Sequence, residues 1–143
     1  MKNFKIFFTI LFFAVSFVGH AQKVKMKKGI VTIDEVATYK FEEEGSITTF
    51  SSNSGVEFLS VNTTDYDATH SSKFGRSYTY KVYVYTLRFL ESGKELTTDL
   101  DLKAISKALY KSNMVDENGK IDEEKLNIFI NKYNNENLKY KIN

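Results

Sequence analysis

Asp65, Asp67 and His70 lie within six residues of one another, and their types and spacing could support chemistry. Two carboxylates and an imidazole could bind a divalent cation, or the imidazole could act as a base. A metal site usually needs a further ligand, however, and a segment of this polar composition is also typical of a solvated loop. The three residues therefore predict either a site of a small hydrolase or metal-dependent enzyme, or a solvated segment.

Other motifs with catalytic or ligand-binding spacing are incomplete. Residues 114–125 resemble a calcium loop, but Met114 and Lys125 occupy its first and twelfth positions, where acidic ligands are needed. The serines near His70 lack the Gly-x-Ser-x-Gly elbow of serine hydrolases. Residues 42–44 are glutamates that could suggest the carboxylate pair of a glycosidase, but we predict that they lie on a turn, where adjacent side chains point in different directions. The sequence thus assigns no catalytic residue, no metal ligand and no cofactor.

Tyrosine is the more informative residue type. The chain has nine tyrosines, and four of them fall between Tyr78 and Tyr85. A tyrosine combines a flat apolar ring with a hydroxyl group, which suits recognition of sugars, peptides or protein surfaces. The alternative is that strand tyrosines pack in a core with the hydroxyl at its edge. Tyr78 and Tyr80 follow the segment that holds Asp65, Asp67 and His70, so these five residues are the candidate binding residues.

The first residues have the features of a secretory signal. Lys2 and Lys5 precede the apolar segment 6–18, which is followed by Gly19-His20-Ala21. A positive start, a short apolar core and a small-x-small cleavage site define a signal peptide, and this apolar core is too short to span a membrane. We therefore predict a cleaved signal at residues 1–21, no stable membrane anchor after cleavage, and a periplasmic or secreted protein.

The composition that remains after the predicted cleavage limits the kinds of partner to be expected. Two of the 20 basic residues and none of the 18 acidic residues lie in the predicted signal, so 18 of each remain. A chain without net charge has no electrostatic reason to bind nucleic acid or anionic membranes. Cysteine is absent, which excludes disulfides, lipid attachment through cysteine and thiolate metal sites.

Alternating apolar residues dominate the part of the chain after the signal. They predict strands at 30–33, 36–41, 47–50 and 56–61, and a longer strand at 78–90 with apolar residues on both faces. We expect the basic segment 23–28 to be a short lead-in. Residues 62–76 are polar, and we predict that they form the longest loop, a kind that is usually functional or disordered.

Two helices are predicted towards the C-terminus. Leu102, Ile105 and Leu109 are spaced three and four apart, after candidate caps at residues 97–99. Asp122 is the cap of the second helix, whose apolar stripe comprises Leu126, Phe129, Ile130 and Tyr133.

Strands followed by helices predict an α+β domain at residues 22–133, followed by a polar tail at 134–143. We expect an antiparallel sheet of about five strands with the two helices packed on one face. The face predicted to carry the helices holds Tyr83, Tyr85, Leu87 and Phe89.

Several short segments resemble a group of small secreted bacterial proteins of unknown function. They are Lys27-Lys28-Gly29-Ile30-Val31, Glu57-Phe58-Leu59, Lys120-Ile121-Asp122 and Phe129-Ile130-Asn131-Lys132-Tyr133. Members of this group have no established activity, so the resemblance implies no functional residue.

Together these observations predict a non-catalytic binding or accessory protein of the cell envelope, with an envelope protein or a glycan as its partner. The alternatives are an enzyme built on Asp65, Asp67 and His70, and a structural subunit that presents a sheet edge to other copies.

Overall fold

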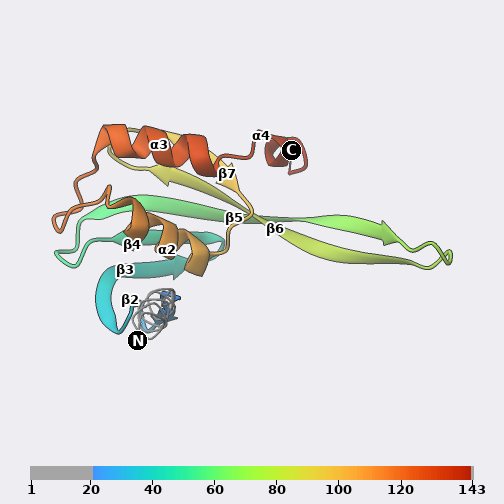
Figure 1. Cartoon of the computed structure of the whole chain (residues 1–143), viewed down its shortest axis with the longest axis horizontal. Helices are drawn as coiled ribbons and strands as arrows, with labels where there is room; N and C mark the ends of the chain where they lie inside the picture. The colour runs from blue at the N-terminus through green and yellow to red at the C-terminus, as the bar shows by residue number, and fades with distance from the viewer. Residues whose placement is uncertain (1–20, 143) are drawn as a thin grey trace, which may run out of the picture.

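The computed structural model describes residues 21–142, so the predicted signal peptide lies outside the described residues except for Ala21. The described chain has the predicted α+β class, with an antiparallel sheet followed by helices (Figure 1). The strands are β1 (Val24–Lys27), β2 (Ile30–Ile33), β3 (Val36–Glu44), β4 (Ile47–Ser51), β5 (Glu57–Ser71), β6 (Ser77–Phe89) and β7 (Glu95–Thr98). The helices are α2 (Leu102–Ser112), α3 (Glu123–Tyr133) and α4 (Glu136–Lys139). Within residues 21–142, no helix has the length and apolar character needed to cross a membrane.

The sheet has the simplest possible topology. Its seven strands are ordered β1-β2-β3-β4-β5-β6-β7, and every neighbouring pair is antiparallel. Register shifts at Val31/Thr32 and Phe50/Ser51 mark irregularities in the β2–β3 and β4–β5 ladders. Because such bulges bend a strand and increase its twist, they help the sheet to curl into a half-barrel (Figure 1).

Two strands were not expected, which raises the strand number from about five to seven. β1 lies in the segment predicted to be a lead-in. There Val24 and Met26 are half-buried and alternate with the exposed Lys25 and Lys27, a period-2 pattern that the basic composition obscures. β7 lies among the predicted helix caps, and the cap of α2 is instead Asp101, whose Oδ1 accepts a hydrogen bond from Ala104 N at 2.7 Å.

Both main helices pack on one face of the sheet, as predicted. The core joins Leu59, Val61, Leu87 and Phe89 of β5 and β6 to Ile105, Leu109, Leu126 and Phe129 of α2 and α3. The ring of Phe89 meets the ring of Phe129 edge-on, with centroids 6.1 Å apart. The face predicted to carry the helices is correct for Leu87 and Phe89, and Tyr85 packs partly against the core. For Tyr83 the prediction is wrong, because this side chain is 52% exposed.

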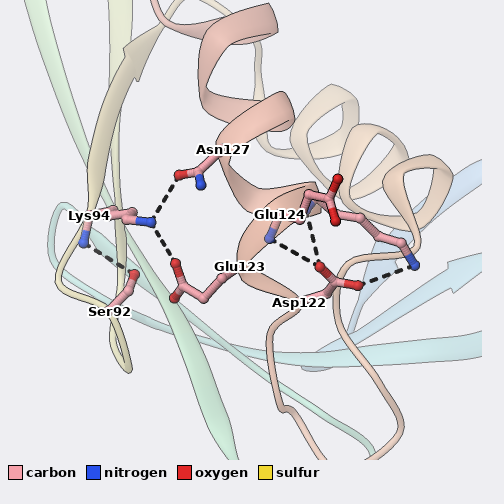
Figure 2. Close-up of polar contacts among 7 residues, drawn as sticks. Ser92, Lys94, Asp122, Glu123, Glu124 and Asn127 are labelled. Carbon is pink, nitrogen blue, oxygen red and sulfur yellow. Dashed lines mark hydrogen bonds and ion pairs between the residues drawn. The ribbon is translucent and has the colours of Figure 1, made fainter.

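Polar contacts fix the start of α3 (Figure 2). Asp122 caps the helix as predicted, since its Oδ1 accepts hydrogen bonds from the backbone N–H groups of Glu124 and Lys125. Lys94, in the turn just before β7, donates to Glu123 Oε2 at 2.5 Å and to Asn127 Oδ1 at 2.9 Å. These contacts tie the first turn of α3 to the turn between β6 and β7.

The segment predicted to be a polar tail packs against the sheet. Asn135 N donates to Thr97 O at 2.7 Å, and Thr97 N donates to Asn134 Oδ1 at 3.0 Å. These bonds cover the outer edge of β7. α4 follows and buries Leu138, which is 7% exposed.

β5 and β6 form a ribbon that extends far beyond the rest of the sheet (Figure 1). β5 has 15 residues and β6 has 13. The prediction of a long loop at residues 62–76 is therefore wrong for most of its length, because β5 continues to Ser71 and a short turn then leads into β6 at Ser77. The strand was missed because the side chains on both of its faces are polar or aromatic rather than alternating with apolar core residues.

Candidate interaction surface on the projecting hairpin

The outer half of the ribbon is bounded by the last partners of its neighbouring strands. Asn62 is the last β5 residue that pairs with β4, and Tyr85 is the last β6 residue that pairs with β7. Beyond these points β5 and β6 pair only with each other, in an unbroken register that ends at Ser71 and Ser77. We call residues 64–84 the arm; it projects from the domain as a two-stranded ribbon (Figure 1).

Alternation along the strands gives the arm two chemically different faces. One, here called the aromatic face, carries Tyr66, Ala68, His70, Tyr78, Tyr80 and Val82. The other, here called the polar face, carries Asp65, Asp67, Thr69, Ser71, Ser77, Thr79, Lys81 and Tyr83.

The aromatic face presents its rings to solvent. Tyr78 and Tyr80 are 58% and 48% exposed. The ring centroids of His70 and Tyr78 are 5.2 Å apart, and those of Tyr78 and Tyr80 are 6.0 Å apart. At the tip, Phe74 is 93% exposed. The three neighbouring rings of His70, Tyr78 and Tyr80 form one aromatic platform.

The polar face satisfies its own charges. Lys81 forms an ion pair with Asp65 and lies 3.9 Å from Asp67 Oδ1. The hydrogen bond with Asp65, aided by the charges of both carboxylates, raises the pKa of Lys81. Nearer the tip, hydroxyl groups meet across the strands, with Ser71 Oγ 3.1 Å from Ser77 Oγ. This face therefore pairs its polar groups within the arm.

The C-terminal segment reaches the base of the aromatic face. Lys141 Nζ lies 5.5 Å from the ring centroid of Tyr66 and 3.5 Å from its hydroxyl oxygen. A cation over an aromatic ring is attracted to it. This contact holds the last described turn of the chain against the point where the arm leaves the domain.

The structure separates the residues of the predicted enzyme site. Asp65 and Asp67 lie on the polar face, whereas His70 lies on the aromatic face beside Tyr78. Among residues 21–142 no group of three acidic or histidine side chains is arranged to hold a metal ion. His70, Tyr78 and Tyr80 are brought together, and the two carboxylates instead engage Lys81.

Sequence reasoning missed two members of this surface, Tyr66 and Phe74. The signal that could have found Tyr66 is the alternation of Thr64, Tyr66, Ala68 and His70 along a segment that was assigned to a loop. Because Tyr and Thr favour strands, that pattern and the similar one in β6 together indicate a hairpin. Phe74 was recognisable only as an aromatic residue next to Gly75.

Apart from the arm, the domain has a concave surface near the β2–β3 and β4–β5 turns. It is an open cleft of about 800 Å³ whose lining includes Tyr39, Asn53, Tyr110 and Asp116. Burial, aided by the nearby Tyr110, raises the pKa of Tyr39 to about 12. Asn53 Nδ2 donates to Ala37 O, and Asp116 Oδ1 accepts from Asn118 N. These bonds engage the side chains of Asn53 and Asp116 with backbone groups of the surrounding turns.

Comparison with known proteins finds no matching family model, no matching curated protein and no matching solved structure. The geometry of the arm therefore carries the functional argument.

Proposed function

We propose that this chain is a non-catalytic binding protein of the cell envelope that holds an envelope protein against the aromatic face of its arm. The observation that carries the proposal is the platform formed by His70, Tyr78 and Tyr80, which stays largely exposed on a strand pair whose backbone is hydrogen-bonded. Aromatic side chains on a preordered backbone lose little entropy on binding and commonly dominate interface energetics.

The exposed rings of Tyr78 and Tyr80 support this function because they do not pack in the core. Tyr78 contacts Tyr80 and His70, and neither tyrosine belongs to the domain core. Aromatic side chains such as tyrosine are enriched at protein–protein interfaces relative to the rest of the surface. A core role, the alternative considered for strand tyrosines, does not account for side chains that are about half exposed.

The enzyme alternative receives no comparable support. Asp65 and Asp67 are engaged by Lys81 on the face opposite His70. A base and its partner groups must lie within hydrogen-bond reach of one reacting atom. Strand alternation directs these side chains to opposite sides of the ribbon, so binding is the function that the geometry favours.

The location is part of the proposal. The positive and apolar start of the chain favours export to the periplasm or beyond. The resemblance of several short segments to small secreted bacterial proteins of unknown function agrees with that location. An aromatic platform also suits the flat faces of sugar rings, so a glycan is the partner that the experiment below must distinguish from a protein.

A photo-crosslinking pair tests the proposal. Tyr80 and Tyr83 lie on opposite faces of the same strand and are 48% and 52% exposed. Each is replaced in turn by p-benzoylphenylalanine, and intact cells of a host that exports the protein are irradiated. We expect a discrete envelope protein to be crosslinked from position 80 and not from position 83.

Equal crosslinking from both positions, or crosslinking from position 83 alone, would contradict the assignment of the aromatic face. Attachment of glycan rather than protein at position 80 would overturn the protein partner. The complementary double substitution Tyr78→Ala/Tyr80→Ala should lower capture at least tenfold, which corresponds to about 1.4 kcal/mol.

A further inference from the structure

The backbone at the edge of the arm is a second feature, independent of its aromatic side chains. Leu90 N donates to Phe58 O at 3.0 Å, whereas Phe89 N donates to Lys94 O at 2.9 Å. Even-numbered residues of β6 therefore direct their backbone groups towards β5, and odd-numbered residues direct theirs towards the β7 side. The register of β5 with β6 is unbroken, so this alternation continues to the tip.

β7 ends before the arm begins. Its last pairing is Thr98 with Tyr85. Within residues 21–142, no strand lies beside the outward-facing odd positions of β6 in the arm, which are Ser77, Thr79, Lys81 and Tyr83. A row of unpaired N–H and C=O groups of this kind is a template for another strand.

We propose that a second copy of this chain occupies that edge, so that two arms pair antiparallel through β6 and form a closed dimer with a four-stranded ribbon. An axis at Tyr80 pairs Ser77 with Tyr83 of the other copy and Thr79 with Lys81. Each copy then offers the backbone groups of all four outward-facing residues. The arrangement is isologous, because the same edge is used by both copies and is consumed by the pairing.

The residues of this edge favour pairing with themselves. Segment 77–84 reads Ser-Tyr-Thr-Tyr-Lys-Val-Tyr-Val, which is rich in strand-forming residues, has one charged side chain and contains no proline. Lys81 is the residue that would guard the edge, but its charge is engaged by Asp65 and Asp67. With the axis at Tyr80, Lys81 lies opposite Thr79 and like charges are not brought together.

The other edge of the arm is less suited to self-pairing. β5 carries Asp65 and Asp67 on its outer half. An axis at Tyr66 would place Asp65 opposite Asp67 of the other copy, whereas an axis at Ala68 would pair Asp67 with Thr69 and Asp65 with Ser71. Because Asp and Ala are depleted in strands, whereas the β6 edge is rich in Tyr, Thr and Val, β6 is the favoured edge.

The proposed pairing joins residues 77–83 of each copy in four residue pairs, each of which places the outward-facing backbone groups of both partners opposite each other. The dimer would also bring the two aromatic faces into one surface, with Tyr80 beside its own copy. The inference therefore goes beyond the proposed function and does not depend on it.

A pair of matched proline substitutions tests the dimer. Thr79 and Thr69 are cross-strand partners, and each directs its backbone N–H outward, one at each edge of the arm. Proline is tolerated at an edge when the N–H it removes faces solvent. Sedimentation velocity of the purified full-chain product should show a concentration-dependent dimer for the wild type and Thr69→Pro, and a monomer for Thr79→Pro.

A second pair keeps the backbone unchanged. Tyr80→Lys places two like charges beside the axis, whereas Ala68→Lys places the same charge on the same face of β5. We expect the first substitution to weaken the dimer at least tenfold and the second to leave it unchanged. A wild type that stays monomeric at all concentrations up to about 100 µM would overturn the inference, because its dimer would then be weaker than micromolar association.

Loss of the dimer in Thr69→Pro but not in Thr79→Pro would also overturn it, because the β5 edge would then be the contact. If the wild type forms species larger than a dimer and both proline variants lose them, the contacts form an open chain through both edges, and the closed dimer is overturned. These measurements use the purified protein without a partner, so they fail or succeed separately from the crosslinking experiment.

Discussion

The two halves of the β5–β6 ribbon have the same backbone pairing and opposite surroundings. In the inner half, Leu59, Val61, Leu87 and Phe89 are each at most 1% exposed and pack beneath α2 and α3. In the arm the same strands carry Tyr78 and Tyr80 about half exposed, without a helix over them. The comparison shows that one ribbon is divided into a part that stabilises the domain and a part that is available for contact.

The division follows from where apolar surface is removed from water. Burial of apolar side chains is the dominant favourable contribution to folding. An isolated two-stranded hairpin is marginally stable, so the arm depends on its inner half to hold the strands together. Exposed side chains of the arm can therefore be changed with little effect on the domain, whereas buried side chains of the inner half cannot.

The largest effect is expected in the inner half. Phe89→Ala removes a ring that is fully buried and contacts Phe129. Such a substitution should lower the free energy of unfolding by about 3–5 kcal/mol, because it combines lost burial with a cavity. Urea denaturation followed by circular dichroism checks this value. A loss of less than about 1 kcal/mol would contradict the placement of Phe89 in the core.

A smaller effect is expected from Tyr39 at high pH. Burial raises its pKa from the ordinary 10.0 to about 12 in the folded protein. The unfolded chain therefore releases this proton first, and the free energy of unfolding should fall as the pH rises from 10 to about 12. The decrease should be roughly 2 kcal/mol.

Tyr39→Phe should remove that part of the decrease, because phenylalanine has no proton to release. The measurement is the difference in the free energy of unfolding between wild type and variant at pH 9 and pH 12. A difference that stays constant over this range would contradict the burial of the hydroxyl group.

The smallest effect on stability is expected in the arm. Tyr78→Ala/Tyr80→Ala removes two rings that contact each other outside the core, one of which also contacts His70. The free energy of unfolding should change by less than about 1 kcal/mol, the range of exposed cross-strand pairs. Thermal and urea denaturation of the double variant test this. A loss as large as that of Phe89→Ala would show that the arm belongs to the folding core.

The sequence was most informative where apolar residues recur at a regular spacing. The stripe of Leu126, Phe129, Ile130 and Tyr133 and the cap Asp122 were sufficient to predict α3. β6 was also predicted, because apolar and aromatic residues occupy both of its faces. In these elements the local pattern and the tertiary packing agree.

The parts that could not be predicted lack such a pattern. The outer half of β5 has solvent on both faces, so its residues 62–71 resemble a polar loop in composition. Leu138 lies in a largely polar segment, and only its position against the sheet reveals that it is buried. Of the candidate site, Tyr78 and Tyr80 were identified, but their placement with His70 and apart from Asp65 and Asp67 required the register of β5 with β6.

The central claim is that the arm binds the partner and that the inner half of the ribbon stabilises the domain. Removal of the arm tests this claim most directly. Tyr66 and Val82 form a cross-strand pair, so residues 67–81 can be replaced by Asn-Gly, the preferred two-residue hairpin turn. We predict that the shortened protein keeps its free energy of unfolding within about 1 kcal/mol and captures no envelope partner. Loss of several kcal/mol, or capture equal to that of the wild type, would contradict the account.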